Sequence, residues 1–294
     1  MVKKHLGRIY IALMLLLMYL PILILVIYSF QDTATIKFGV FNDFTFKLYK
    51  DLFDMSNRQT REIWIAVAHT LEIAIAAAIV STIIGTLGAI GIFYSSKRVR
   101  NTLNSIANIS IVNAEIVTAL SLRILYSLLN VKLSFFTLLI GHVVLTIPFV
   151  VLNVMPKLQQ MDPNEYEAAL DLGATPAVAL RKVVIPEITP GIISGFLLSI
   201  TLSLDDYIIT AYTADTTFDT LSTYVYKSMV KRSIPLQFRS LTTIIFFAIL
   251  IGVVIYGIVK RNKEKVNNIH GVRRNEAWKI NLYQLVQFLQ FAFH

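Results

Sequence analysis

Residues 161–190 read MDPNEYEAALDLGATPAVALRKVVIPEITP, a polar segment between two apolar stretches of the chain. Asp162 can cap a helix that has Pro163 at its first position, and Glu165 stands at the spacing of a capping box. Gly173 can end the same helix, because glycine readily adopts the backbone conformation that follows a helix. The segment therefore predicts a short helix inside a connection between two longer ones.

The apolar stretches on either side belong to a set of six that could cross a membrane. About 20 helical residues span a hydrocarbon layer of about 30 Å. The six stretches are 9–30, 63–94, 106–129, 135–155, 192–212 and 241–259. Hydrophobic residues make up 55% of the 294 and charged residues 15%, which argues against a soluble globular domain. The expected fold class is an all-α membrane protein with six transmembrane helices.

The basic residues indicate how these helices are oriented. Sixteen of the 27 lysines and arginines lie in the N-terminus, the second and fourth connections and the tail, and ten lie in the other connections. By the positive-inside rule both termini are cytoplasmic, as is the fourth connection, at about 156–190. The net charge is +9, and the basic residues cluster beside apolar stretches. This placement indicates that they lie at a lipid bilayer surface and do not bind nucleic acid.

Several acidic residues lie in or at the ends of the predicted spans. A carboxylate at the bilayer centre costs about 3 kcal/mol on insertion scales, so each one calls for a reason. The residues are Glu72, Glu115, Asp205 and Asp206, and an interfacial position is favoured for Glu72. Arg123 is a candidate partner for Glu115 or for either aspartate, either as part of a site or as a structural pair.

The fifth stretch carries polar residues at helical spacing. Ser199, Ser203, Asp206 and Thr210 are separated by four, three and four residues, which places them along one helix face. We interpret this face as lining a pathway for a cation. Asp205 is rotated by about 100° from its neighbour, so both cannot point into one pore. Substrate contact and structural pairing both stay open for the two aspartates, with substrate contact favoured for Asp206.

The polar connection resembles the EAA loop of ABC importer permeases. That pattern is Glu-Ala-Ala, three residues, Gly, nine residues and Ile-x-Leu-Pro. The matching positions here are Glu167, Ala168, Ala169, Gly173, Val183, Ile185 and Pro186, with aliphatic replacements at Val183 and Ile185. The resemblance implies a type I importer permease fold over residues 1–268, in which this helix couples to a cytoplasmic ATPase. An ordinary solvated helix is the alternative.

Other runs are similar to the second permease subunit of spermidine/putrescine importers. They are NAEIVTALSLRILY (113–126), GHVVLTIPFVVLNVMPKL (141–158), SITLSLDDYIIT (199–210) and YVYKSMVK (224–231). The resemblance implies a bacterial inner-membrane protein that works with a second permease, two copies of an ABC ATPase and an external substrate-binding protein. Ala114 stands where that subunit usually has proline, and the tail at 269–294 departs from the family. No role is assigned to this tail.

A polyamine would suit the acidic residues, because its ammonium groups need separated carboxylates. Tyr207 and Tyr212 could add cation–π contacts, although a place in the interfacial aromatic belt is favoured for both. No G-x-x-x-x-G-K-[ST] sequence occurs, so ATP and Mg are expected on the partner ATPase and no cofactor on this chain.

Alternatives of other kinds stay open. An ABC permease for another solute, such as sulfate, iron or molybdate, would share the same loop. A secondary transporter would use the buried acids as cation sites without an ATPase. An enzyme is the weakest hypothesis, because His69 and His142 are far apart and belong to no nucleophile or metal-ligand motif, so no catalytic residue and no metal ligand is predicted.

Overall fold

The computed structural model describes residues 2–32, 44–231 and 234–269, and within these ranges every regular element is a helix. The predicted tail at 269–294 lies outside these residues except for Ile269. The described residues form two compact units: one contains those up to Trp64 together with 227–269, and the other contains Ile65–Tyr226.

The first unit contains α1 (Val2–Tyr28), α2 (Lys47–Phe53), the first turns of α3 (Arg58–Tyr94) and α12 (Gln237–Ile269). Leu48 and Leu52 of α2 are fully buried. Polar contacts fix this short helix: Ser240 Oγ of α12 donates to the Leu48 carbonyl at 3.1 Å, and Trp64 Nε1 donates to the Leu52 carbonyl at 2.8 Å. α2 is thus held against the start of α12 and the first turns of α3.

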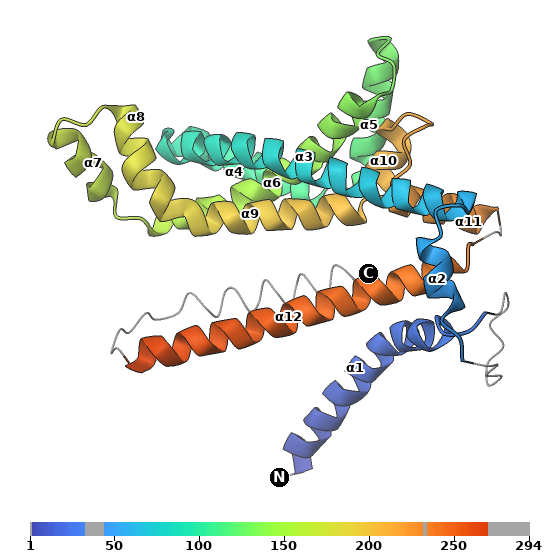
Figure 1. Ribbon diagram of the computed structural model, residues 1–294. Coiled ribbons are helices and arrows are strands. Elements are labelled where there is room, and N and C mark those ends of the chain that lie inside the picture. The colour runs from blue at the N-terminus through green and yellow to red at the C-terminus, as the bar shows by residue number, and fades with distance from the viewer. Residues whose placement is uncertain (1, 33–43, 232–233, 270–294) are drawn as a thin grey trace. The chain divides into compact units, whose positions relative to one another are not determined.

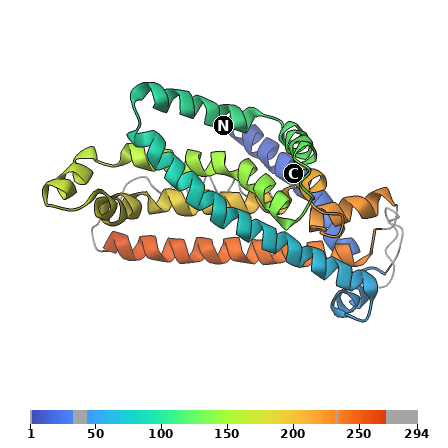
Figure 2. The same ribbon diagram turned by 90° about the horizontal axis from the view of Figure 1, so that it is seen from above.

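The second unit is built on α6 and α9, which lie side by side along most of their lengths (Figures 1 and 2). Its elements are the rest of α3, α4 (Lys97–Val112), α5 (Glu115–Leu128), α6 (Phe135–Gln160), α7 (Pro163–Asp171), α8 (Pro176–Ala179), a π-helix (Leu180–Val184), α9 (Ile185–Asp205), α10 (Ile208–Thr213) and the first turns of α11 (Leu221–Val230).

Small residues allow these helices to approach closely. A Cβ at Gly85 of α3 would lie 2.7 Å from the Val150 side chain, and one at Gly195 of α9 would lie 3.2 Å from Val150 Cα. At Gly191 the nearest atom would be the Asn153 carbonyl oxygen, 2.7 Å away. Glycine therefore lies where α3 and α9 each touch α6, as expected for helices that pack without an aqueous hydrophobic drive.

Five helices are long and apolar enough to cross a membrane among the residues described: Tyr10–Tyr28, Arg58–Tyr94, Phe135–Gln160, Pro176–Asp205 and Gln237–Ile255. They confirm five of the six predicted spans in kind, with bounds that differ from the predicted ones. The third predicted span is wrong as one helix, because 106–129 is interrupted between α4 and α5 at Asn113 and Ala114. The fifth is wrong in extent, because α9 begins at Ile185 and ends at Asp205.

The polar connection forms the helix that its sequence predicts. The Asp162 side chain accepts a hydrogen bond from Asn164 N at 3.0 Å and caps α7. After α7, Gly173 has a φ of +85°, and Ala174 N donates to the Ala169 carbonyl at 3.0 Å. This pattern is a Schellman motif, which glycine adopts without the cost that a side chain would bring.

Replacing Gly191 should test the close approach of α6 and α9. Gly191→Ala places a methyl group against a backbone carbonyl that cannot rotate away, so we expect a loss of about 1–3 kcal/mol in the free energy of unfolding. Gly88→Ala is the matched control on α3, because nothing lies within 4 Å of its added Cβ. Thermal unfolding in detergent measures both, and equal midpoints for the two variants would contradict the packing described.

Candidate functional site

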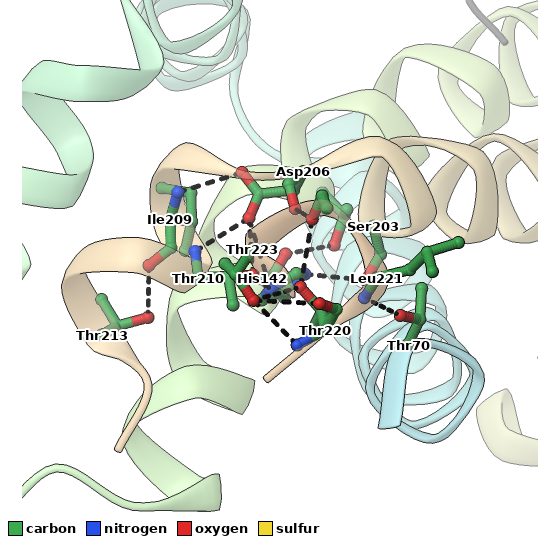
Figure 3. Close-up of polar contacts among 12 residues, drawn as sticks. Thr70, His142, Ser203, Asp206, Ile209, Thr210, Thr213, Thr220, Leu221 and Thr223 are labelled. Carbon is green, nitrogen blue, oxygen red and sulfur yellow. Dashed lines mark hydrogen bonds and ion pairs between the residues drawn. The ribbon is translucent and has the colours of Figure 1, made fainter. Parts of the chain in front are cut away.

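The chain changes direction at Asp206, between α9 and α10. Asp206 has φ −65° and ψ 125°, an extended conformation that ends α9. Its carboxylate then accepts hydrogen bonds from Ile209 N at 3.0 Å, from Thr210 N at 2.9 Å and from Thr210 Oγ1 at 2.9 Å (Figure 3). These donors are among the amides that a new helix leaves without an intrahelical partner. Asp206 therefore caps α10.

His142 of α6 contacts both sides of this helix break. Its Nδ1 lies 2.7 Å from Ser203 Oγ in the last turn of α9, and its Nε2 lies 3.0 Å from Thr210 Oγ1 in the first turn of α10. Nε2 is also 3.5 Å from the Asp206 carboxylate, and both side chains are almost completely buried. The imidazole thus joins α6 to the two helix ends at once (Figure 3).

Further bonds satisfy the backbone around the break. Ser222 Oγ donates to the Asp206 carbonyl at 2.8 Å. Thr137 Oγ1, at the start of α6, lies 2.9 Å from the Thr213 carbonyl at the end of α10. Tyr126 of α5 in turn donates to the Thr137 carbonyl at 3.0 Å. Backbone groups freed by the interruption therefore have side-chain partners, which an apolar environment demands.

A small cavity of about 60 Å³ opens beside the break, lined by Glu115, Thr201, Leu202, Asp205 and Asp206. Asp205 and Glu115 are both exposed in the isolated chain. Within the described residues, neither carboxylate forms an ion pair, and Arg123 is exposed and pairs with no acidic residue. The cavity therefore presents two unpaired acidic groups, one from α5 and one from the end of α9.

The residues of the predicted pathway face are buried in this structure. Ser199 and Ser203 are buried, and Ser203 faces His142 of α6. Asp206 is 5% exposed and its oxygens are already occupied by three donors. Ser203 and Thr210 both bond to His142 of the neighbouring helix α6, whereas Asp206 also lines the cavity. Substrate contact at Asp206, which the sequence favours, stays a prediction; in this structure Asp206 is buried and Asp205 is exposed.

The remaining predicted side chains are placed as follows. Tyr207 is half-buried and its ring centroid lies 4.5 Å from that of Tyr226. Glu72 is exposed on α3, and His69 Nδ1 lies 3.1 Å from the Asp219 carbonyl. Across the part of the chain that is described, no three His, Asp or Glu side chains gather as metal ligands would.

The Glu-Ala-Ala positions lie at the opposite end of the α6–α9 pair from the break (Figure 1). Glu167 and Ala168 are exposed, Ala169 is half-buried, and Pro186 is exposed near the start of α9. Leu172, which the sequence did not single out, has 89% of its surface exposed. An apolar side chain at a polar loop tip is the signal that could have identified it.

A family described as the binding-protein-dependent transport system inner membrane component has a sequence model that matches residues 81–267. The spermidine/putrescine transport system permease protein PotC of Escherichia coli strain K12 is 33% identical over 251 residues, covering 85% of this chain and 92% of that protein. The putrescine transport system permease protein PotI of the same strain is 30% identical, covering 87% and 92%. The PotC homolog of Mycoplasma genitalium is 26% identical, covering 94% and 99%.

Solved structures share the fold. A bacterial ABC transporter involved in the import of the acidic polysaccharide alginate has a chain that is similar with a TM-score of 0.61 at 15% identity, covering 89% of this chain and 98% of that chain. An amino acid ABC transporter has a chain with a TM-score of 0.53 at 18% identity, covering 70% and 95%. At these identities the similarity concerns the arrangement of helices alone.

The two aspartates should differ in their effect on stability. Asp206→Asn replaces one accepting oxygen with a donor that faces the amides of α10, so we expect a loss of about 1–3 kcal/mol in the free energy of unfolding. Asp205→Asn removes no hydrogen bond among those described and should change it by less than about 0.5 kcal/mol. Thermal unfolding in detergent compares them; a larger loss for Asp205→Asn would overturn the assignment of Asp206 as the cap.

Proposed function

Because the chain belongs to the family of binding-protein-dependent transport system inner membrane components, we propose that it is a permease subunit of an ATP-driven ABC importer for polyamines. Spermidine and putrescine are the substrate class we assign. Two relatives named for these cations, PotC and PotI of Escherichia coli, are at least 30% identical over more than four-fifths of the chain, which supports this choice. The proposed location is the bacterial inner membrane, with both termini cytoplasmic.

The observation that carries the cargo assignment is the pair of unpaired carboxylates on the cavity. Asp205 and Glu115 offer two negative charges without a described cation nearby. A polyamine has ammonium groups separated by methylene units, so it can meet such carboxylates one after another as it moves. The cavity has room for a few water-sized groups, which is enough for an ammonium group and its neighbouring methylenes but not for the whole molecule. We therefore assign it as one step of a pathway that a second permease completes.

We propose that α7 is the contact for the ATPase. Exposed residues, Glu167, Ala168 and Leu172, lie at the tip of a capped helix beneath α6 and α9, and small side chains there permit a close approach. ATP and Mg belong to two copies of that partner, and an external binding protein delivers the cargo. A domain over residues 1–268 with six crossings follows from the proposal, with α4 and α5 together supplying the third.

An ABC permease for another solute, such as sulfate, iron or molybdate, is the second candidate. It would use the same α7 but would gain nothing from two acidic groups if the solute were an anion, since like charges repel. A secondary cation transporter is the more distant alternative. Uptake that continues without ATP would support it, whereas the importer proposed here requires ATP on the inner side.

Replacing the acidic side chains of the cavity with neutral amides should reduce polyamine uptake without unfolding the protein. We expect Asp205→Asn and Glu115→Gln each to lower ATP-dependent uptake of labelled spermidine by about tenfold, because each removes a charge that offsets the loss of water around an ammonium group. Glu72→Gln is the control, since Glu72 is exposed on α3 away from the cavity. Proteoliposomes containing the whole importer provide the measurement, with labelled sulfate as a second cargo. Unchanged spermidine uptake in both variants would contradict the site.

Changing the α7 terminus should separate transport from assembly in the membrane. Gly173→Val forces a β-branched residue into a positive φ, which costs about 1–2 kcal/mol locally and distorts the loop tip. We expect membrane insertion to be unchanged and spermidine uptake to be lost. Co-purification with the ATPase subunit reports the contact directly. Full co-purification and full uptake in this variant would argue against docking at α7.

A further inference from the structure

We propose that His142 is a positioning residue for the cation site: it fixes the facing ends of α9 and α10 so that the Asp205 carboxylate points into the cavity. The inference rests on the proposed function, because it assigns Asp205 to the cargo. His142 has 0% of its surface exposed, so it does not itself meet a cation in the pathway. Its role is to hold the residue that does.

The hydrogen-bond directions around the imidazole are consistent with one arrangement. Thr210 Oγ1 donates its single proton to the Asp206 carboxylate, so it can only accept from His142 Nε2. Nε2 therefore carries the ring proton, and Nδ1 accepts from Ser203 Oγ. The result is a continuous chain of bonds from the last turn of α9, through α6, to the cap of α10. A neutral histidine completes it with both ring nitrogens used.

The neighbouring residue shows how closely α6 approaches α10 here. A Cβ on Gly141 would lie 2.6 Å from Ile209 Cγ2 and 3.1 Å from Thr213 Oγ1. The α10 backbone is thus held against α6 on one side while His142 binds its first turn. Without the imidazole, the hydroxyls of Ser203 and Thr210 would lose their shared partner in a buried place, where water does not replace it.

The consequence for Asp205 follows from its place in the chain. Asp205 is the last residue of α9, two positions after Ser203 and one before the cap. One residue corresponds to about 100° around a helix, so unwinding the last turn would move its carboxylate off the cavity. A shift of about 1 Å in the Asp205 carboxylate would strongly weaken its contact with an ammonium group of the cargo. His142 therefore affects the cargo through Asp205.

The test is a double-mutant cycle in proteoliposomes containing the complete importer, with labelled spermidine as the probe. His142→Leu should lower uptake per assembled complex by about tenfold when Asp205 is present, and by less than about twofold in the Asp205→Asn background. His142→Gln should restore at least about half of the uptake, because its amide can donate toward Thr210 in the place of Nε2. Thr146→Val is the matched control: this residue is equally buried one turn further along α6, and its hydroxyl bonds only to carbonyls of its own helix.

The outcomes separate the inference from the proposed function. Equal losses from His142→Leu with and without the Asp205 carboxylate would overturn the positioning role and leave a purely structural one, as would a failure of His142→Gln to restore uptake. Should His142→Leu fail to assemble, Ser203→Ala, which removes the hydroxyl bonded to Nδ1, takes its place in the cycle, and a loss that is equal with and without the Asp205 carboxylate would overturn the positioning role. If the wild-type importer moves a different solute, the polyamine assignment fails, and the same cycle measured with that solute still decides the role of His142.

Discussion

A helix that is interrupted inside an apolar layer must find partners for the backbone groups it releases, and this constraint shapes the second unit. The interruption at Asp206 frees amides at the start of α10, and one carboxylate takes up two of them. A buried charge of this kind persists only when it is fully hydrogen-bonded. Thr210 and His142 complete its surroundings, so the break, the cap and the histidine depend on one another.

The same constraint separates two adjacent aspartates into two roles. Both residues line the cavity, but the Asp206 carboxylate accepts three hydrogen bonds within the protein, whereas the Asp205 carboxylate accepts none among the described residues. The helices around the break pack closely, since glycines of α3 and α9 lie against α6 at several positions. At its far end α9 continues through the π-helix and α8 toward α7. The proposed ATPase contact and the proposed cation site are therefore connected by one nearly continuous helix.

Sequence reasoning succeeded where local chemistry decides the conformation. Asp162, Pro163 and Gly173 specify a helix start and end in any surroundings, and α7 has those bounds. Apolar length likewise identified the helices long enough to cross. Prediction from the sequence is wrong where tertiary contacts decide the conformation. Nothing in the apolar run 192–212 indicates that Asp206 bonds forward to α10, so the sequence predicts one helix there. Spacing aligns Ser199 and Ser203 on one face for the same reason without saying which neighbour they face, and in this structure both are buried. The partners of His142 could not be predicted from the sequence, since Ser203 and Thr210 are 61 and 68 positions away.

In the proposed importer, the pathway passes the Asp205 side of α9 and not the serine side. The chain contains no cysteine, so single thiols can be introduced without background. In the assembled importer, the thiol from Asp205→Cys should react with a positively charged methanethiosulfonate reagent, and spermidine should slow that reaction. The thiol from Ser203→Cys should stay unreactive, because that position is 1% exposed. Rapid, spermidine-protected labelling at 203 with an inert thiol at 205 would contradict the account.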